Sequence, residues 1–180
     1  QAVVIGEDLG TVPDGIFDLL QQFGMYSYRI FFFEQAEDGG FTSTAHYPVQ
    51  AMSALTTHDM PTLIGFWHCS DLKLGLEIGL YNEKILPSLY ADRHASKQKI
   101  LDSMHGHQIL PVDFERVVDT VGMSRTLGFA LQQHLAKGSC QLLCLQLEDW
   151  LEMTQPVNIP GTSDEYPNWR RKLTHTLEQL

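Results

Sequence analysis

Basic residues are scarce in this sequence. Its 180 residues include 12 Lys and Arg against 22 Asp and Glu, which gives a formal net charge of -10. A protein that binds the phosphate backbone of nucleic acid needs a basic patch on its surface. The concentrated positive run, Arg170-Arg171-Lys172, is too short to form one. We therefore expect no nucleic-acid partner.

Cysteines and long apolar runs are also few. Cys69, Cys140 and Cys144 have neither the even count of a disulfide framework nor the spacing of a zinc knuckle. We expect free thiols in a reducing, cytoplasmic compartment. No stretch approaches the ~18 apolar residues of a membrane span, and the first residues lack the basic and apolar regions of a secretory signal. We expect no membrane partner.

The motifs that bind phosphate cofactors and metals are missing. Gly6 and Gly10 do not form a phosphate loop, because neither G-x-G-x-x-G nor G-K-[ST] is present. The histidines show no ligand spacing such as H-E-x-x-H. His58-Asp59 is a pair also found in metal phosphohydrolases, but there it lies on a helix, and here it follows a β-type run and precedes Pro61. We expect no cofactor and no metal.

The composition that remains is that of a folded protein, with 43% hydrophobic, 10% aromatic and 19% charged residues. This length and composition predict one globular domain, residues 1–180, with a core of its own. Gln1 and Ala2 lead directly into an apolar run without an initiator Met. We therefore expect a fragment of a longer protein.

The first residues predict a strand, a helix and a second strand. Val3-Val4-Ile5 is a β-branched run typical of a strand buried on both faces. Apolar residues then recur at helical spacing, as Ile16, Leu19, Leu20 and Phe23, and predict a helix with Thr11 as its N-cap and Gly24 as its stop. Residues 25–33 are rich in Tyr, Ile and Phe and predict the second strand. Such a unit implies a parallel strand pair.

The alternation of strands and helices continues along the chain. Apolar and β-branched runs predict strands over 53–57 and 141–147. Apolar residues at helical spacing predict helices elsewhere, over 62–67, within 71–107, over 116–136 and over 168–180.

Ionisable residues follow three of the predicted strands, as Glu7-Asp8, His58-Asp59 and Glu148-Asp149. Parallel strands bring such ends to one edge of a sheet, and converging carboxylates are what glycoside chemistry requires. Each pair also has a simpler interpretation. Glu7 and Asp8 can be solvated loop residues, His58 a structural histidine, and Glu148-Asp149 the start of a helix, which we favour for that pair.

The motifs around these residues resemble those of the 4-α-glucanotransferase (amylomaltase or disproportionating enzyme) family. The resemblance covers essentially the whole chain and fits the C-terminal part of the family's sequence. It is carried by four segments: Gly6-Glu7-Asp8-Leu9-Gly10-Thr11-Val12-Pro13, Thr56-Thr57-His58-Asp59-Met60-Pro61-Thr62, Pro156-Val157-Asn158-Ile159-Pro160-Gly161-Thr162 and Asn168-Trp169-Arg170-Arg171-Lys172.

The resemblance implies an α/β fold, the C-terminal half of a TIM (β/α)8 barrel. The predicted strands would be strands five to eight. The helical stretch of approximately residues 68–122 would be an insertion between strands seven and eight.

The resemblance also implies site residues. Glu7 would be the general acid/base, and Asp59 the carboxylate that binds sugar hydroxyls and stabilises the transition state. His58 and Asp8 would support substrate binding. Asn158 would line the groove for the maltodextrin substrate together with its turn residues Pro160 and Gly161.

One part of the family pattern is missing. The family nucleophile is an Asp in an Arg-x-Asp-His-type motif after the fourth strand, and no Asp of this sequence matches it. We therefore expect a parent enzyme that transfers α-1,4-glucan segments with retention, and an isolated chain that is inactive. The alternatives are a hydrolase of the α-amylase clan and a catalytically silent, sugar-binding or structural half-barrel. Open barrel edges also favour self-association.

Overall fold

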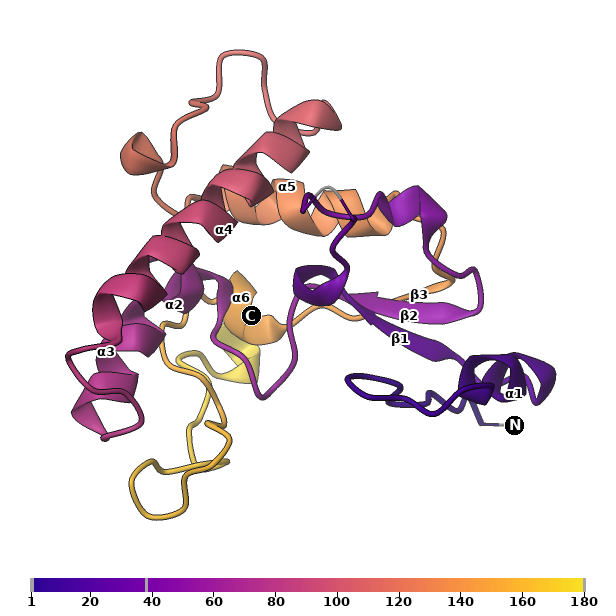
Figure 1. The fold of residues 1–180 in the computed structure, drawn as a ribbon, viewed down its shortest axis with the longest axis horizontal. Helices are drawn as coiled ribbons and strands as arrows, with labels where there is room; N and C mark the ends of the chain where they lie inside the picture. The colour runs from indigo at the N-terminus through magenta and orange to yellow at the C-terminus, as the bar shows by residue number, and fades with distance from the viewer. Residues whose placement is uncertain (1, 38, 180) are drawn as a thin grey trace. The chain divides into compact units, whose positions relative to one another are not determined.

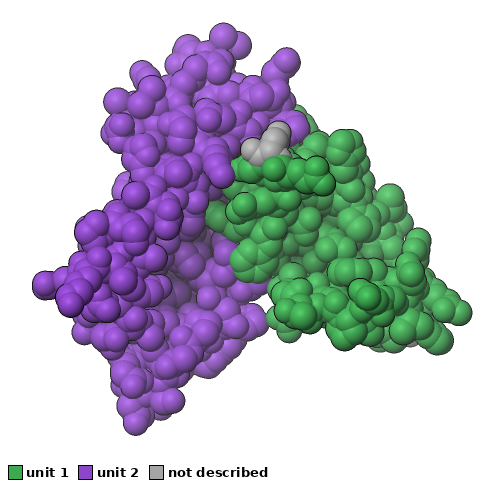
Figure 2. Space-filling view, viewed as in Figure 1, with its two compact units in different colours: residues 1–55, 130–145 green, residues 56–129, 146–180 purple. Residues whose placement is uncertain are grey.

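The computed structural model describes residues 2–37 and 39–179. Gln1, Asp38 and Leu180 lie outside the described residues, and with them the ends of the predicted domain 1–180 and of the predicted helix 168–180. The chain divides into two compact units, shown in Figure 2. The first unit contains residues 1–55 and 130–145, and the second contains residues 56–129 and 146–180. The prediction of a single domain stays a prediction.

The first unit is built on a parallel sheet of three strands in the order β1-β2-β3, which lie side by side in Figure 1. The strands are β1 (Ser27–Ile30), β2 (Ala51–Ala54) and β3 (Leu142–Leu143). In this register Ile30 lies opposite Ala54, and both side chains are fully buried. The predicted α/β class with a parallel sheet is therefore confirmed.

The opening run pairs as predicted, but its burial was predicted wrongly. Ile5 forms an isolated parallel bridge with Tyr26, and the amide of Gly6 donates to the Tyr26 carbonyl at 2.8 Å. Val3 and Val4 are nevertheless 65% and 50% exposed. The segment pairs with Tyr26 on one side only. Among the described residues, none covers the Val3 and Val4 side chains well enough to bury them.

Helix α1 (Ile16–Gln22) begins later than predicted. Thr11 does not cap it. The N-cap is Gly15, whose φ of 84° is left-handed, and no side chain caps the helix. Gly24 ends it as predicted, because its φ of +67° is readily adopted by glycine.

The predicted strand 25–33 is shorter in the structure. After β1 the chain tightens into the 3₁₀ helix η1 (Phe31–Phe33). Phe31 is fully buried and stacks on Phe41 with ring centroids 4.4 Å apart. Phe31 thus contributes to the core through a turn that follows the strand, whereas Phe33, two residues later, is 56% exposed. A second 3₁₀ helix, η2, spans Thr44–His46.

Two other predicted strands also have different limits. The strand predicted over 53–57 is β2, which begins earlier because Ala51 pairs with Ser27. The strand predicted over 141–147 is reduced to β3, because the chain enters helix α6 (Leu147–Trp150). Glu148 and Asp149 lie in the first turn of α6, which confirms the interpretation that they start a helix.

A succession of helices lies in the part of the second unit between residues 56 and 129. They are α2 (Leu63–Trp67), α3 (Ser70–Glu77), α4 (Leu86–Gly106), the 3₁₀ helix η3 (Val118–Thr120) and the start of α5 (Arg125–Ala136), which continues into the first unit. The helix predicted over 116–136 is shorter, because the Ser124 hydroxyl accepts a hydrogen bond from the Leu127 amide at the start of α5. On α4, Arg93 forms an ion pair of 2.6 Å with Asp71 of α3 and lies over the ring of Phe66.

The prediction of a helix over 168–180 is wrong. Within the described residues 168–179, the only helical segment is the 3₁₀ helix η4 (Leu177–Gln179). Asn168 and Arg171 are held instead by contacts to the preceding loop. The amide of Trp169 donates to the Val157 carbonyl at 2.9 Å, and Trp169 has a φ of 61°, which is incompatible with a helix. Among the described residues, no helix is long and apolar enough to span a membrane.

Candidate active site

Glu7 is exposed and directly follows the bridged segment of the first unit. Its neighbour Gly6 lies against α1, since a Cβ added there would come within 2.9 Å of Leu20 Cδ2. Tyr28 on β1 is near enough to feel the charge of Glu7. Burial, with smaller contributions from Cys144 and Glu7, raises the pKa of Tyr28 to about 12. At neutral pH the Tyr28 phenol therefore keeps its proton.

Asp8, the next residue, has a different environment. It is buried, and its Oδ1 accepts a hydrogen bond of 2.7 Å from the Tyr28 amide. Its Oδ2 accepts one of 2.6 Å from the Ser27 hydroxyl and lies 3.9 Å from the guanidinium of Arg29. Asp8 thus fastens the backbone beside Glu7 to β1. Its predicted part in substrate binding stays a prediction.

The structure brings His58, Asp59 and Asn158 together in the second unit. Asp59 Oδ1 accepts a hydrogen bond of 2.6 Å from the Asn158 side-chain amide and lies 3.3 Å from His58 Nε2. The Asp59 amide donates to the Thr57 hydroxyl at 3.2 Å, which shapes the turn. The His58 and Asp59 side chains are 49% and 45% exposed, so both are accessible to a ligand.

Pro160 and Gly161 form the tight turn that follows Asn158. The amide of Thr162 donates to the Ile159 carbonyl at 3.3 Å, and Gly161 has a φ of +81°. Pro at the second position and a left-handed Gly at the third are typical of a type II turn. Both residues are exposed, and their predicted contact with substrate stays a prediction.

The loop with Asn158 is fastened to the segment that carries the Asn-Trp-Arg-Arg-Lys motif. Asn168 accepts a hydrogen bond of 2.8 Å from the Ile159 amide and donates to the Thr162 hydroxyl at 2.8 Å. Arg171 and the Tyr166 hydroxyl both donate to the Pro156 carbonyl, at 3.3 and 2.6 Å. This motif of the sequence therefore has a structural role in holding Asn158.

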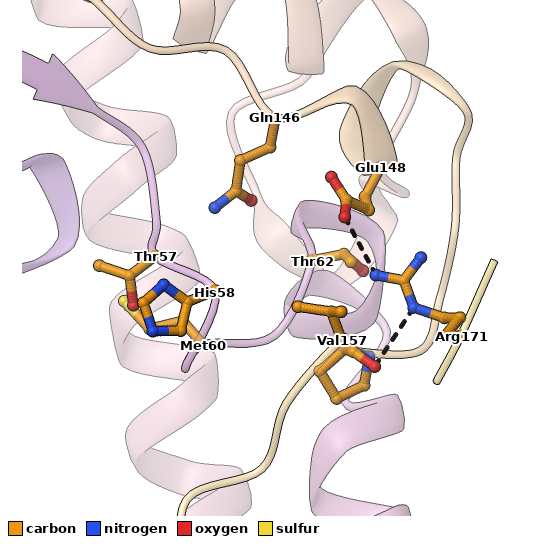
Figure 3. Close-up of a pocket in the computed structure, with 9 residues that line it drawn as sticks. Thr57, His58, Met60, Thr62, Gln146, Glu148, Val157 and Arg171 are labelled. Atoms are coloured by element: carbon orange, nitrogen blue, oxygen red, sulfur yellow. Dashed lines mark hydrogen bonds and ion pairs between the residues drawn. The ribbon is translucent and has the colours of Figure 1, made fainter. Parts of the chain in front are cut away.

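A pocket of about 150 Å³ lies beside His58. Figure 3 shows Glu148 and Arg171 pointing toward each other at its wall, with an ion pair of 3.2 Å between them. The pocket is lined by Thr57, His58, Met60, Thr62, Gln146, Glu148, Pro156, Val157 and Arg171.

Sequence reasoning did not identify Gln146, Glu148 and Arg171 as part of this pocket. A signal was present for Glu148, which belongs to the acidic pair after the fourth predicted strand. Arg171 belongs to the short basic run. The contact between them joins positions 23 residues apart, which no local pattern indicates.

Asp149, the residue after Glu148, contacts α2. Its Oδ1 accepts a hydrogen bond of 2.8 Å from the amide of Leu63, the first residue of that helix. Burial raises the pKa of the Asp149 carboxyl to about 6, and the charge of Glu148 adds to this effect. The hydrogen bond from Leu63 opposes it.

The predicted site residues fall in both units. Glu7 and Asp8 belong to the first, and His58, Asp59 and Asn158 to the second. The convergence of Glu7 with Asp59 therefore stays a prediction. Among residues 2–37 and 39–179, no three His, Cys, Asp or Glu side chains form a group that could hold a metal ion.

Comparison with known proteins identifies the family. The family model described as 4-alpha-glucanotransferase matches residues 1–177. The chain belongs to the 4-alpha-glucanotransferase family. It is 38% identical to the 4-alpha-glucanotransferase of Haemophilus influenzae over 177 residues, which are 98% of this chain and 25% of that protein. It is 33% identical to that of Mycobacterium tuberculosis over 180 residues, which are 96% of this chain and 24% of that protein.

Solved structures of this family match the fold. Amylomaltase from Corynebacterium glutamicum matches with a TM-score of 0.85 and 32% identity, over 96% of this chain and 25% of that one. Amylomaltase from Streptococcus agalactiae in complex with acarbose matches with a TM-score of 0.58 and 17% identity, over 92% of this chain and 26% of that one. The latter shows the fold alone. The chain spans about a quarter of the length of the curated relatives it matches.

Proposed function

We propose that this chain forms part of the active site of an enzyme that transfers α-1,4-glucan segments between maltodextrins with retention. The observation that carries the proposal is the half-exposed Asp59 carboxylate, which Asn158 and His58 contact at 2.6 and 3.3 Å in a member of the 4-alpha-glucanotransferase family. A charged carboxylate held beside amide and imidazole groups suits the hydroxyls and the developing positive charge of a sugar ring.

In this proposal Asp59 stabilises the oxocarbenium-like transition state and binds sugar hydroxyls. His58 and Asn158 donate hydrogen bonds to the same sugar. The lining of the pocket beside His58 combines polar side chains, among them Gln146 and Glu148, with the apolar Met60 and Val157. The relative from Streptococcus agalactiae forms a complex with acarbose, and we propose that maltodextrins bind this chain beside Asp59.

Glu7 is the proposed general acid/base. It would protonate the leaving glycosidic oxygen and then take the proton of an acceptor hydroxyl. Its exposure suits proton exchange with substrate, and Asp8 holds the backbone beside it. A retaining mechanism needs a second carboxyl about 5–5.5 Å away as nucleophile. No Asp of this chain matches the family nucleophile, so we propose that a part of the enzyme outside this sequence supplies it.

The strands support a place in a (β/α)8 barrel. The bridge of Ile5 with Tyr26 extends the parallel order β1-β2-β3 by one neighbour on the β1 side. Sequential parallel order is what consecutive strands of a barrel show. We propose that Val3–Ile5, β1, β2 and β3 are strands five to eight. Helices α3 and α4 lie within the proposed insertion of approximately residues 68–122.

The proposal is tested in the full-length enzyme that contains this chain, with maltotriose as substrate. We expect Glu7→Gln to lower transfer by about 10²- to 10⁴-fold, the usual contribution of a general acid/base. Asp59→Asn should have an effect of similar size. Asp92→Asn, at an exposed position of α4, is the control and should leave the rate unchanged. Near-normal transfer by Glu7→Gln would remove Glu7 from this role.

Product analysis of the same reaction distinguishes transfer from hydrolysis. Transfer yields glucose together with longer oligosaccharides, whereas a hydrolase of the α-amylase clan would yield only shorter products. The 180-residue chain alone should release no glucose, because it lacks the proposed nucleophile. Turnover by the purified chain would contradict that assignment.

A further inference from the structure

Three polar side chains of the segment Gln146–Asp149 contact three different points around Asp59. We name this segment the 146–149 bracket. It contains the acidic pair Glu148-Asp149, to which the proposed mechanism gives no role. The three contacts are made to positions far away in the sequence. Two lie before and after the His58-Asp59 turn, and the third is Arg171, which in turn donates to the loop that carries Asn158.

The first two contacts fix the ends of the turn. Before the turn, the Thr56 hydroxyl donates to Gln146 Oε1 at 2.6 Å. After it, the Leu63 amide donates to Asp149 Oδ1 at 2.8 Å. Thr56 and Leu63 are 1% and 3% exposed, so both hydrogen bonds hold the turn at buried positions.

The third contact reaches the partner of Asp59. Glu148 Oε1 lies 3.2 Å from Arg171 Nη2, and Arg171 Nε donates to the Pro156 carbonyl at 3.3 Å. Pro156 is buried and lies two residues before Asn158. Figure 3 shows this line of dashed contacts from Glu148 through Arg171. One short segment thus holds both sides of the hydrogen bond between Asn158 and Asp59.

We propose that the 146–149 bracket positions Asp59, with Asp149 holding the turn and Glu148, through Arg171, holding Asn158. These are positioning residues, since they act on Asp59 through hydrogen bonds and an ion pair. The inference rests on the proposed catalytic role of Asp59 for its kinetic consequence, but not for its structural one. A displacement of about 1 Å in such a group can lower a rate by about 10²-fold.

The structural consequence is measured first, in the 180-residue chain. The side-chain amide resonances of Asn158 report its hydrogen bond to Asp59. We expect Asp149→Ala and Glu148→Ala each to shift these resonances, because each removes one acceptor of the bracket. Asp149→Asn and Glu148→Gln keep a carbonyl oxygen in place and should leave them near their original positions. Unchanged resonances in both alanine variants would overturn the proposal.

The kinetic consequence is measured in the full-length enzyme. We expect Asp149→Ala to lower kcat by about 10- to 100-fold while KM changes by less than about threefold, since a displaced Asp59 loses contacts made in the transition state. Asp149→Asn should restore kcat to within about threefold. A purely structural role would instead lower the folded fraction, which thermal unfolding measures separately. If Asp149→Ala does not fold, the same comparison is made with Glu148→Ala and Glu148→Gln, which test the contact through Arg171.

The outcomes separate this inference from the proposed function. A normal kcat in both alanine variants, in an enzyme that Asp59→Asn inactivates, would overturn the positioning role. Full activity of Asp59→Asn would overturn the proposed function instead, and the amide resonances of Asn158 would still decide whether the bracket holds that contact.

Discussion

Two adjacent acids, Glu7 and Asp8, have opposite environments, because only Asp8 is taken up by hydrogen-bond donors of β1. Glu7 is exposed, whereas Asp8 is 7% exposed and takes hydrogen bonds from Ser27 and the Tyr28 amide. Their chemistry follows from these environments. An exposed carboxylate can exchange a proton with substrate. A buried carboxylate that accepts two hydrogen bonds stabilises the fold instead.

Removal of the Asp8 carboxylate should therefore destabilise the first unit. Asp8→Ala leaves the Ser27 hydroxyl, the Tyr28 amide and Arg29 without this partner, and we expect a loss of about 3–5 kcal/mol, as for other broken buried pairs. Ser27→Ala removes one of these hydrogen bonds and should cost about 1 kcal/mol. Denaturant unfolding of the two variants measures both values. Equal, small losses would show that Asp8 is not a major anchor.

The Asp149 carboxyl should make stability depend on pH. Burial raises its pKa from 3.8 to about 6 in the folded chain, so the folded state binds this proton more tightly than the unfolded state does. The free energy of unfolding should thus fall as pH rises from about 4 to about 6, by about 3 kcal/mol at most. Glu148 adds to this effect with its negative charge, and Arg171 pairs with Glu148.

Asp149→Asn tests this dependence. Asparagine keeps an oxygen for the Leu63 amide but carries no charge, so we expect a more stable chain at pH 7 and a flatter profile between pH 4 and 6. Urea unfolding at several pH values is the measurement. Asp92→Asn on α4 is the control, since it removes a carboxylate at an exposed position. An identical profile in wild type and Asp149→Asn would contradict the raised pKa.

At the scale of the element, the turn after Asn158 depends on backbone conformation more than on packing. Gly161 has a φ of +81°, and a Cβ added there would meet no atom within 4 Å. The turn therefore needs glycine for its dihedral angle alone. The same is true of Gly24 at the end of α1. It has a φ of +67°, and a Cβ added there would also meet no atom within 4 Å.

Gly161→Ala should cost about 1–2 kcal/mol, the penalty of a left-handed conformation for a residue with a Cβ. The matched control is Gly106→Ala in the last turn of α4, where a Cβ also meets no atom within 4 Å but the glycine has no left-handed φ. That substitution should stabilise the chain by about 0.5–1 kcal/mol. Thermal unfolding compares them, and effects of the same sign would contradict this explanation.

At the scale of the whole molecule, the opening run leaves an apolar strand segment open. Val3 and Val4 are 65% and 50% exposed, and the hydrogen bonds of this segment run to Tyr26 on one side. Exposed β-type segments of this kind favour pairing with another chain. The isolated 180-residue chain should consequently self-associate.

A single charge at this segment should reduce self-association. We expect the chain to form dimers or larger species by light scattering, and Val4→Lys to shift it toward the monomer, because lysine blocks edge-to-edge pairing. Val112→Lys is the control, since Val112 is 93% exposed in a loop of the second unit. A monodisperse wild-type monomer would contradict the prediction.

Much of the local structure was predictable from residue patterns. Helices within 71–107 follow from apolar spacing, the end of α1 follows from Gly24, and the start of α6 was anticipated for Glu148-Asp149. The errors lie where contacts from elsewhere override a local pattern. Residues 168–180 have the spacing of a helix, but Asn168 and Arg171 bond instead to the loop of Pro156–Thr162.

The sequence alone was sufficient to predict the parallel α/β class, the acids that follow its apolar runs, and the family. These properties depend on neighbouring residues and on the order of short motifs. The tertiary structure decided which of two adjacent acids is buried and which polar groups surround Asp59. Asn158 meets Asp59 across 99 positions, and Asp149 meets Leu63 across 86. Such contacts arise from packing of distant segments and from the need to satisfy buried hydrogen-bonding groups, which no local pattern contains.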